Sequence, residues 1–541
     1  MRYLYNNIQV ILIAFVVSSL AWLFGGTRGP LIVAVAPWLL LVLAEIVFFL
    51  PQRHEKESIY DARDRVWDAM KHDPFAWIVA LTLFLLLIPL ANNGLCPDCD
   101  AALIAQGIDP SPRVSFLPFC VNRREHLSVL LWIALALMSA LAVRHSLRGC
   151  GKRLLVKLLV WNGFAVAILG FVQAASGAPG PLWDYVPNHA PGGYFATWGY
   201  PNMAGCYFTL MFALSAAMWR RGCDEADRER AAADLEVGTE PVSRHRAFWR
   251  RHHYLIPAAV CFFAAINTMS RAAIMLSTTL AVVFFAHAFI SFSRKLPRPV
   301  RVRRGAIALV AGGVVAFFAV VSIPDKVQRE FDKTDTRTVL DRVTGKRDFN
   351  VPAAMAVWRD HPTFGCGGWG FRHFCVAKMS SAARKRFIEH PDWHSGSANV
   401  HNDYVQALAE HGCVGLALLL GAVLMLLIPV WKSWRYLYQL VRFAKTSKLP
   451  AKPALLFVLP APAFSILAGA VAVGVHAFGD CPLRSPAVLS LLFVSLAAVP
   501  GFIPRSSRNL GLRVGDGEDE EHEHSSHEHS SHEHSSKEGR K

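Results

Sequence analysis

The sequence predicts an all-α polytopic membrane protein with about twelve transmembrane helices and one long, partly helical loop outside the cytoplasm. Of its 541 residues, 53% are hydrophobic and only 18% are charged, which is less charge than soluble domains carry. The apolar residues gather in runs of roughly 20, the length that crosses a bilayer core as a helix. Since the backbone inside lipid must satisfy its own hydrogen bonds, each run is interpreted as a helix.

The apolar runs give the candidate membrane spans. They cover residues 8–24, 30–50, 75–91, 127–143, 154–173, 202–219, 254–269, 272–292, 305–323, 413–430, 454–475 and 486–504. The first run could be taken for a signal peptide. It lacks a small-residue cleavage pattern and a second apolar run follows at once, so it is interpreted as a retained helix.

The net charge of +16 reflects topology rather than nucleic-acid binding. Lys and Arg concentrate in alternate short loops, at 53–71, 144–157, 220–251, 294–304 and 432–452. This positive-inside pattern predicts that both termini lie in the cytoplasm and that the basic loops meet anionic lipid headgroups. No nucleic-acid motif is present, and no nucleic-acid partner is expected. The same topology places the long loop 324–412 outside the cytoplasm.

These patterns divide the chain into four parts: nine helices with short loops (1–323), the large outer loop (324–412), three helices (413–504) and a tail (505–541). The tail repeats His-Glu-His-Ser-Ser, which cannot bury a core, so we expect it to be disordered and cytoplasmic with adventitious metal affinity. Residues 51–73 carry apolar residues at helical spacing, which predicts an amphipathic helix on the inner leaflet.

Several cysteines fall in the outer loops, where an oxidising compartment permits disulfides. Cys366 with Cys375 is one candidate pair. A second group is Cys96, Cys99 and Cys120. The alternatives for it are a disulfide between two of the three, a metal site, or free thiols. A zinc site needs four ligands and no fourth is evident, so no metal site is expected.

The outer loop carries two segments of chemical interest. After a predicted helix from Pro352 to Asp360, a glycine-rich stretch, 361–370, allows close backbone approach to a ligand or to a helix. It does not follow a strand, which excludes a dinucleotide-binding fingerprint. The second segment, 395–412, predicts a helix capped by Asn399 or Ser397 and ended by Gly412.

His401 falls in the first turn of that helix, whose positive end favours the neutral imidazole of a general base. His401, Tyr404, Val405 and Leu408 share one helix face, whereas Asp403, Ala407 and Glu410 lie on another. A histidine packed between helices is the alternative.

Two further polar features stand beside apolar runs. Arg271 lies in a short turn between two of them, where a charge is costly unless an anion such as phosphate binds it. Snorkelling to the headgroups is the alternative. Asn202 opens the apolar run 202–219 and can cap it, or it serves the turn alone.

These stretches resemble the O-antigen ligase family, which includes O-antigen polymerases and protein O-oligosaccharyltransferases. The resemblance rests on Gly-Tyr-Pro-Asn202-Met-Ala-Gly205, on Ser270-Arg271, on Trp358-Arg-Asp-His-Pro362 running into Gly365-Cys-Gly367, and above all on His401-Asn-Asp-Tyr-Val-Gln-Ala-Leu-Ala-Glu410-His-Gly412. It covers roughly residues 190–430. Many members carry an arginine shortly before the Asn202 segment, where this chain has Gly193; His189, Arg342 or Arg347 are the candidates to replace it.

The resemblance implies a glycosyltransferase of the bacterial inner membrane, with 324–412 as a catalytic periplasmic loop. It would move a glycan from undecaprenyl-diphosphate to a hydroxyl of a lipid-anchored or protein acceptor, lipid A-core or similar, with no cofactor and no metal. His401 would be the general base and Arg271 a phosphate contact. The residues implied in substrate binding are Asn202, Asn402, Arg347, Tyr404 and Glu410.

Two alternatives remain open at this point. Within the family, the chain is a polysaccharide polymerase or a protein O-oligosaccharyltransferase, since the acceptor decides this and no residue reveals it. Outside it, the chain is a transporter of lipid-linked sugars without chemistry, which predicts charged or broken helices at mid-membrane.

Overall fold

The computed structural model describes residues 7–54, 57–93, 114, 116–183, 193–233, 244–293, 350–381, 384–385, 399–446 and 459–503. Several features predicted from the sequence lie outside these residues, and their structure is not discussed. They are the apolar run 305–323, Cys96, Cys99, His189, Arg342, Arg347 and the tail 505–541.

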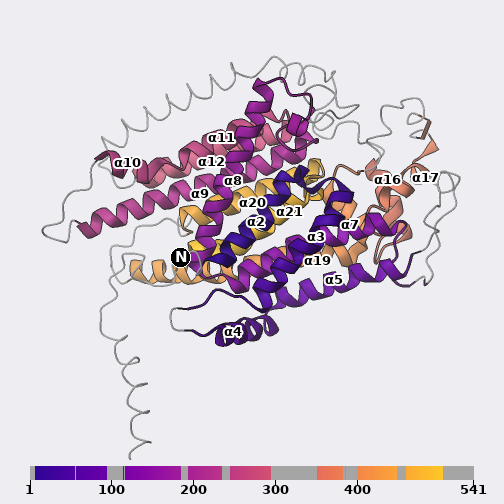
Figure 1. Cartoon of the computed structure of the whole chain (residues 1–541), viewed down its shortest axis with the longest axis horizontal. Coiled ribbons are helices and arrows are strands. Elements are labelled where there is room, and N and C mark those ends of the chain that lie inside the picture. Colours follow the sequence, from indigo (N-terminus) through magenta and orange to yellow (C-terminus); the bar gives the residue numbers. More distant parts are fainter. Residues whose placement is uncertain are drawn as a thin grey trace, which may run out of the picture.

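The described chain is helical and contains no strand, which confirms the all-α fold (Figure 1). Its helices are α2 (Ile8–Trp22), α3 (Gly29–Phe48), α4 (Ile59–Lys71), α5 (Pro74–Ala91), α7 (Arg123–Leu141), α8 (Gly149–Ala175), α9 (Pro201–Ala233), α10 (Arg244–His252), α11 (Leu255–Asn267), α12 (Arg271–Ser293), α16 (Asn350–Asp360), α17 (Phe371–Lys378), α19 (Asp403–Thr446), α20 (Ala461–Gly479) and α21 (Pro486–Ala498).

In the described part of the chain, seven helices are long and apolar enough to cross a membrane, judged by length and composition: α3, α5, α7, α8, α12, α19 and α20. The helices α2 and α21 are apolar but shorter. Every apolar run predicted from the sequence falls on a helix, apart from 305–323. The fold is therefore a multi-pass membrane bundle, and the number of spans stays a prediction.

Helix α21 forms the middle of the bundle. All of its residues are buried, and it packs against α2, α7, α8, α9, α19 and α20. A helix that is apolar on every face has to be surrounded by others, which explains this position. By contrast, α3 and α5 leave Trp38 and Trp77 on the surface, 70% and 64% exposed, as expected of side chains that face lipid.

Helix α4 is the amphipathic helix predicted within 51–73. It begins with a capping box, in which the Ser58 side chain accepts from the Asp61 amide and the Asp61 carboxylate accepts from the Ser58 amide. Val66 on its inner face is buried, whereas Trp67 on its outer face packs edge-on against Phe48. Its position on a leaflet surface stays a prediction.

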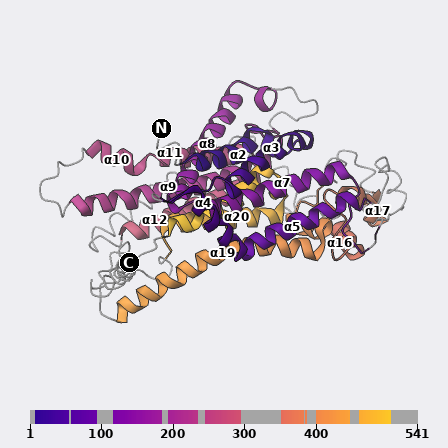
Figure 2. The same cartoon turned by 60° about the horizontal axis from the view of Figure 1, so that its bottom comes forward.

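The outer-loop helices α16 and α17 lie at one end of the bundle, beside the ends of α5 and α7 and far from α10 (Figures 1 and 2). The helix predicted from Pro352 to Asp360 is confirmed as α16. These helices form a second apolar core with the segment before α7, built around Phe119, Phe371 and Phe374, which are buried. The outer loop is thus packed onto the bundle where it has been described.

Candidate functional site

The start of α9 presents two polar side chains to one carboxylate. Pro201 occupies the first helical position, which its fixed φ suits, and so places Tyr200 and Asn202 on either side of the helix entry. The Tyr200 hydroxyl donates to Asp480 at 2.9 Å to Oδ1 and 3.0 Å to Oδ2. The Asn202 side chain donates to the same carboxylate and to the Tyr200 oxygen.

Asp480 lies in the loop between α20 and α21 and is 2% exposed. Besides Tyr200 and Asn202, the backbone N–H of Cys481 donates to its Oδ1 at 2.8 Å, and the Cys481 thiol donates to the same atom at 3.3 Å. A buried carboxylate needs such donors to offset its lost hydration. The site therefore holds one negative charge at a fixed place.

His401 faces this carboxylate across the interior. Its Nδ1 lies 3.0 Å from Asp480 Oδ1. The imidazole side chain is 21% exposed whereas the Asp480 side chain is 3% exposed, so the ring is accessible and the carboxylate is not. Within the described chain, no hydrogen bond is made by Nε2. A carboxylate on Nδ1 selects the tautomer with its proton there, which leaves the Nε2 lone pair available to accept a proton.

The local backbone at His401 differs from the sequence prediction. The helix begins at Asp403 and not before, because the Asn402 side chain accepts from the amides of Tyr404 and Val405 and thereby caps it. Asn399 is not its cap, and Ser397 lies outside the described residues. His401 precedes the helix, with φ of 58°. A left-handed non-glycine residue costs roughly 1–3 kcal/mol and is held only by its surroundings, a condition common at functional sites.

Gly412 ends the short helix as predicted, with φ of 64°, and a second helix follows directly in α19. At this break the amides of Cys413 and Val414 donate to the carbonyls of Pro362 and Thr363. The glycine-rich stretch therefore supplies the acceptors for the new helix start.

The glycines of that stretch meet protein backbone. A Cβ on Gly365, whose φ is 69°, would lie 2.3 Å from the Glu410 carbonyl carbon. The amides of Cys366 and Gly367 donate to the carbonyls of Ala409 and Glu410 and so satisfy the end of the short helix. The sequence predicted that these glycines approach either a ligand or a helix, and in the structure they approach a helix.

Two acids of the short helix hold the loop that carries Asp480. The Asp403 carboxylate accepts from the amide of Leu483 at 2.8 Å. Glu410 forms a buried ion pair with Arg484, at 2.7 and 3.1 Å, and its side chain also accepts from Gln406. The carboxylate of Glu410, predicted to bind substrate, is thus occupied by protein partners. A substrate role for Glu410 stays a prediction.

The indole of Trp369 continues this network toward the outer loop. The Arg484 guanidinium lies 3.9 Å from its ring centroid, and that of Arg372 lies 4.6 Å away. Arg372 and His373 of α17 both pair with Glu125 at the start of α7. These cation–π and ionic contacts fix the outer loop to the bundle.

The other predicted substrate residues of α19 serve as structural contacts in this structure. Tyr404 donates to the Gly474 carbonyl at 2.9 Å, and its ring lies 4.4 Å from that of Phe478, so it joins α19 to α20. Asn402 caps α19, as described above. Neither contact tests a role in binding substrate.

The turn that carries Arg271 lies at the same end of the bundle. Gly205, one helical turn after Asn202, packs against this turn so closely that a Cβ would lie 2.5 Å from the Ala273 Cβ and 3.0 Å from the Ser270 Cβ. Arg271 itself is the first residue of α12 and is partly exposed. The motifs around Asn202, Arg271 and His401 therefore meet, although they are far apart in the sequence.

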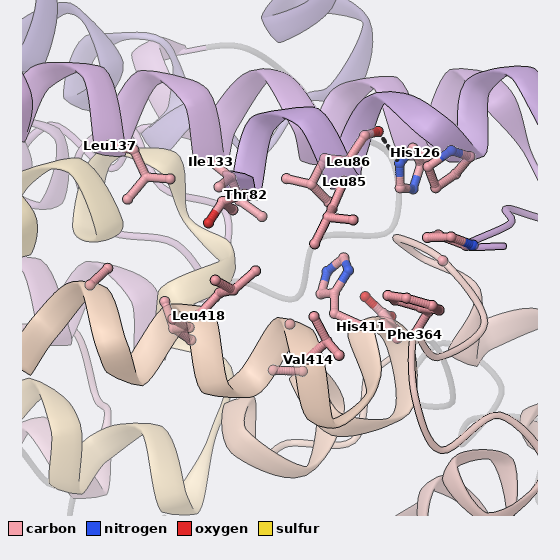
Figure 3. Close-up of a pocket in the computed structure, with 18 of the residues that line it drawn as sticks. Thr82, Leu85, Leu86, His126, Ile133, Leu137, Phe364, His411, Val414 and Leu418 are labelled. Carbon is pink, nitrogen blue, oxygen red and sulfur yellow. Dashed lines mark hydrogen bonds between the residues drawn. The ribbon is translucent and has the colours of Figure 1, made fainter. Parts of the chain in front are cut away.

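An apolar cavity of about 100 Å³ runs from this end of the bundle between α5, α7, α19 and α21. Figure 3 shows Leu137 and Leu418 along it, with His126 and His411 facing each other near one end. His126 accepts from the Gly368 amide at Nδ1 and reaches the Leu86 carbonyl with Nε2, which fixes the neutral tautomer. Glu410 also lines the cavity, so the cavity adjoins the residues that hold the Asp480 loop.

The cysteine pairing expected between Cys366 and Cys375 is wrong, since both are buried free thiols. Cys375 donates to the Asn350 side chain instead. Burial raises the pKa of the Cys375 thiol to about 12. Cys120, also a free thiol, donates to the Pro89 carbonyl, and burial raises its pKa to about 11, with a small opposing effect of Arg123. Each thiol is therefore a protonated packing group.

Among the described residues, one group of side chains could hold a metal ion. The ligand atoms of His401, Asp480 and Cys481 lie within 4.8 Å of one another. Burial, reinforced by the charge of Asp480, raises the pKa of the Cys481 thiol well above its usual value, which opposes the thiolate that a metal requires. Burial and then Asp480 likewise raise the pKa of Tyr200, which keeps it a phenol donor.

The sequence did not single out Asp480, Tyr200 or Arg484. Asp480 had a signal, because it is an acid in a short loop between two apolar runs. Tyr200 stood inside the quoted Asn202 motif without a role. Only the fold shows that Tyr200 and Asp480, which are 280 positions apart in the chain (480 − 200), meet at His401, and that Arg484 pairs with Glu410.

The apolar helices and the histidine–carboxylate cluster at one end of them define a multi-pass membrane protein with a site suited to proton transfer at a membrane surface. Residues 256–420 match the family model described as O-Antigen ligase. This match supports membership of the O-antigen ligase family and, with the apolar helices, indicates a bacterial multi-pass membrane protein of the ligase or glycosyltransferase type. No curated protein matches the chain.

Proposed function

We propose that this protein transfers a glycan from an undecaprenyl-diphosphate carrier to an acceptor hydroxyl at the periplasmic face of the inner membrane. The observation that carries the proposal is the pairing of His401 Nδ1 with the buried Asp480 carboxylate at 3.0 Å. This is the arrangement of a general base with its orienting acid.

In the proposed reaction the neutral His401 Nε2 takes the proton of the acceptor hydroxyl. The acceptor oxygen attacks the anomeric carbon, and the bond from that carbon to the carrier's phosphate oxygen breaks. The electron pair of this bond leaves with the diphosphate. Direct displacement inverts the configuration at the anomeric carbon.

Arg271 supplies the compensating charge in this proposal. The diphosphate gains negative charge as it departs, and a guanidinium beside it stabilises that charge in the transition state without a metal. Support comes from its place, since the Ser270–Ala273 turn packs on α9 one turn from Asn202. Asn202 and Tyr200 then act through Asp480, because both donate to it.

The apolar cavity offers room for the first isoprene units of the carrier. It is lined by side chains of membrane-spanning helices and ends beside Glu410, close to the loop of Asp480. An isoprenoid chain would gain the burial of its apolar surface there. The rest of the chain would remain in the bilayer.

The proposal is tested with purified protein, lipid-linked donor and a hydroxyl acceptor. We expect His401→Ala and Arg271→Ala to lose transfer while they insert and melt like the parent protein. His72→Ala, an exposed histidine outside the site, is the control and should retain full activity. Full transfer by the His401→Ala protein would remove the general base from the mechanism.

The same experiment separates the alternatives. A transporter would move the intact lipid-linked glycan across vesicles and release no free undecaprenyl-diphosphate. Polymerase and ligase differ in the acceptor that is extended. A strain lacking a polymerase would carry single repeat units on its acceptor, whereas one lacking a ligase would carry none.

A further inference from the structure

A second cavity, lined by charged as well as apolar side chains, lies at the end of the bundle opposite His401. It is enclosed by the α4–α5 junction, the end of α7, the start of α8, the middle of α19 and the turn after α21, and its volume is about 520 Å³. Pro429 on its wall follows the break at Gly412 by 17 residues (429 − 412), or about 26 Å along the second helix of α19 at 1.5 Å per residue. A hydrocarbon core is about 30 Å thick, so the cavity sits at the level of the other membrane surface.

The cavity wall carries an excess of positive charge. Among its lining residues, Arg144, Lys152 and Lys432 are cations and Asp73 is the one acid, so the formal charges of the lining sum to +2 (3 − 1) when the lining histidines are neutral. The Asp73 carboxylate is already bound by Arg144 and by His145 Nε2, the latter at 2.7 Å. Its charge is therefore balanced by these two protein partners.

The fold holds these cations in place. Pro429 has no N–H, so the Met425 carbonyl four residues earlier lacks its helical partner, and Arg144 donates to it at 3.3 Å. Lys152 is 7% exposed and donates to the Arg144 carbonyl at 3.2 Å. A cationic cavity with such a fixed wall suits an anion better than a mobile surface lysine does.

The remaining walls are apolar. Met425, Leu426 and Ile428 of α19 line the cavity beside the cations. Trp77 and Trp431, 64% and 59% exposed, lie next to lining residues of α5 and α19. Exposed indoles of this kind gather where a bilayer meets water. One cavity thus offers a phosphate group its charge and an acyl chain its apolar contact.

We propose that this cavity binds the headgroup phosphate of an anionic glycerophospholipid from the leaflet opposite the glycan-transfer site. Basic cavities between membrane helices on the cytoplasmic side bind such headgroups, and the positive-inside charge pattern predicts that this end faces the cytoplasm. Arg144 and Lys152 form the fixed part of the site. Lys432, which is exposed, closes over the phosphate from α19.

The test measures binding of dioleoyl phosphatidylglycerol to the purified full-length protein in neutral detergent, by native mass spectrometry and by the rise in melting temperature. Dioleoyl phosphatidylcholine and inorganic phosphate are the comparison ligands. We expect phosphatidylglycerol to bind and stabilise, and the other two to do so weakly. Stabilisation by inorganic phosphate at the same concentration would assign the cavity to a soluble anion and overturn the lipid assignment.

Charge variants locate the binding. Each basic residue near a membrane surface contributes about 1 kcal/mol, or roughly fivefold in affinity, so Lys432→Gln should weaken phosphatidylglycerol binding roughly fivefold and Lys432→Glu roughly 25-fold. Arg435 is an exposed cation three residues further along α19 that does not line the cavity. Arg435→Gln should change binding less than about twofold. Equal losses for the two residues would reduce the effect to general surface charge and overturn the proposal.

Discussion

Replacement of Asp480 by Asn tests the histidine–carboxylate pair most directly. The amide is nearly isosteric. With its NH₂ group in the place of Oδ1 it would face His401 Nδ1, and its oxygen would keep the donors Tyr200 and Asn202, although the Cys481 N–H would lose its acceptor. An amide donor on Nδ1 selects the opposite tautomer, with the proton on Nε2. The ring would then have no lone pair toward the acceptor hydroxyl, although the site would keep its shape.

The size of the effect follows from the role. A positioned general base contributes about 10²- to 10⁴-fold to the rate, or roughly 3–5 kcal/mol in the activation free energy. We expect Asp480→Asn to lower kcat within this range and to leave the KM for the lipid-linked donor within about threefold. The separation of kcat from KM marks a loss in the transition state rather than in binding.

The assay is the transfer of glycan by the purified protein, with initial rates measured over donor concentration. Tyr200→Phe is the matched control, because it removes one hydrogen bond to Asp480 and leaves the carboxylate on Nδ1. We expect it to cost about tenfold or less. A kcat of the Asp480→Asn protein within threefold of the parent value, with an unchanged melting temperature, would refute the orienting role of Asp480.

Three other predictions concern the surroundings of the site. Val414→Phe should narrow the apolar cavity and raise the KM for a long-chain donor more than for a farnesyl donor, and Leu420→Phe, exposed on the same helix and outside the cavity, should change neither. Arg484→Met should lower the free energy of unfolding by about 3–5 kcal/mol, measured by thermal or denaturant unfolding, because Glu410 is left buried without its ionic partner. The double variant Arg484→Met with Glu410→Met should lose less stability. A chelator should leave transfer unchanged, since the proposed chemistry needs no metal; loss of activity that zinc restores would assign a metal to the His401 cluster instead.

The membrane fold could be predicted because the length and polarity of each transmembrane helix are visible in its own stretch of sequence. The runs that the sequence indicates lie on helices wherever the structure describes them. The helix from Pro352 and the break at Gly412 also followed from local rules, because proline at a first turn and glycine in a left-handed position act within a few residues. Structure that depends only on neighbouring residues can therefore be predicted from the sequence.

The details of the His401 segment could not be predicted in the same way. Three residues before Asp403 could have capped the helix, and the choice of Asn402 depends on His401 being drawn toward Asp480 from another loop. Spacing rules assume that a helix extends as far as its pattern allows. They do not account for a residue such as His401, whose left-handed conformation is held by a contact with Asp480, 79 positions away (480 − 401).

The same argument applies to Glu410, which the family resemblance assigned to substrate binding. From the sequence, Asp403 and Glu410 lie on one helix face, and their spacing does not indicate which groups they bind. In the structure Asp403 accepts from the Leu483 amide and Glu410 pairs with Arg484. Leu483 and Arg484 lie in the loop that connects Asp480 to α21. Because α21 is buried along its whole length, that loop cannot shift without its helix. The geometry of the His401–Asp480 pair is therefore set by the middle of the bundle, and a change that loosens Glu410 should lower kcat through Asp480 rather than through lost contact with the glycan.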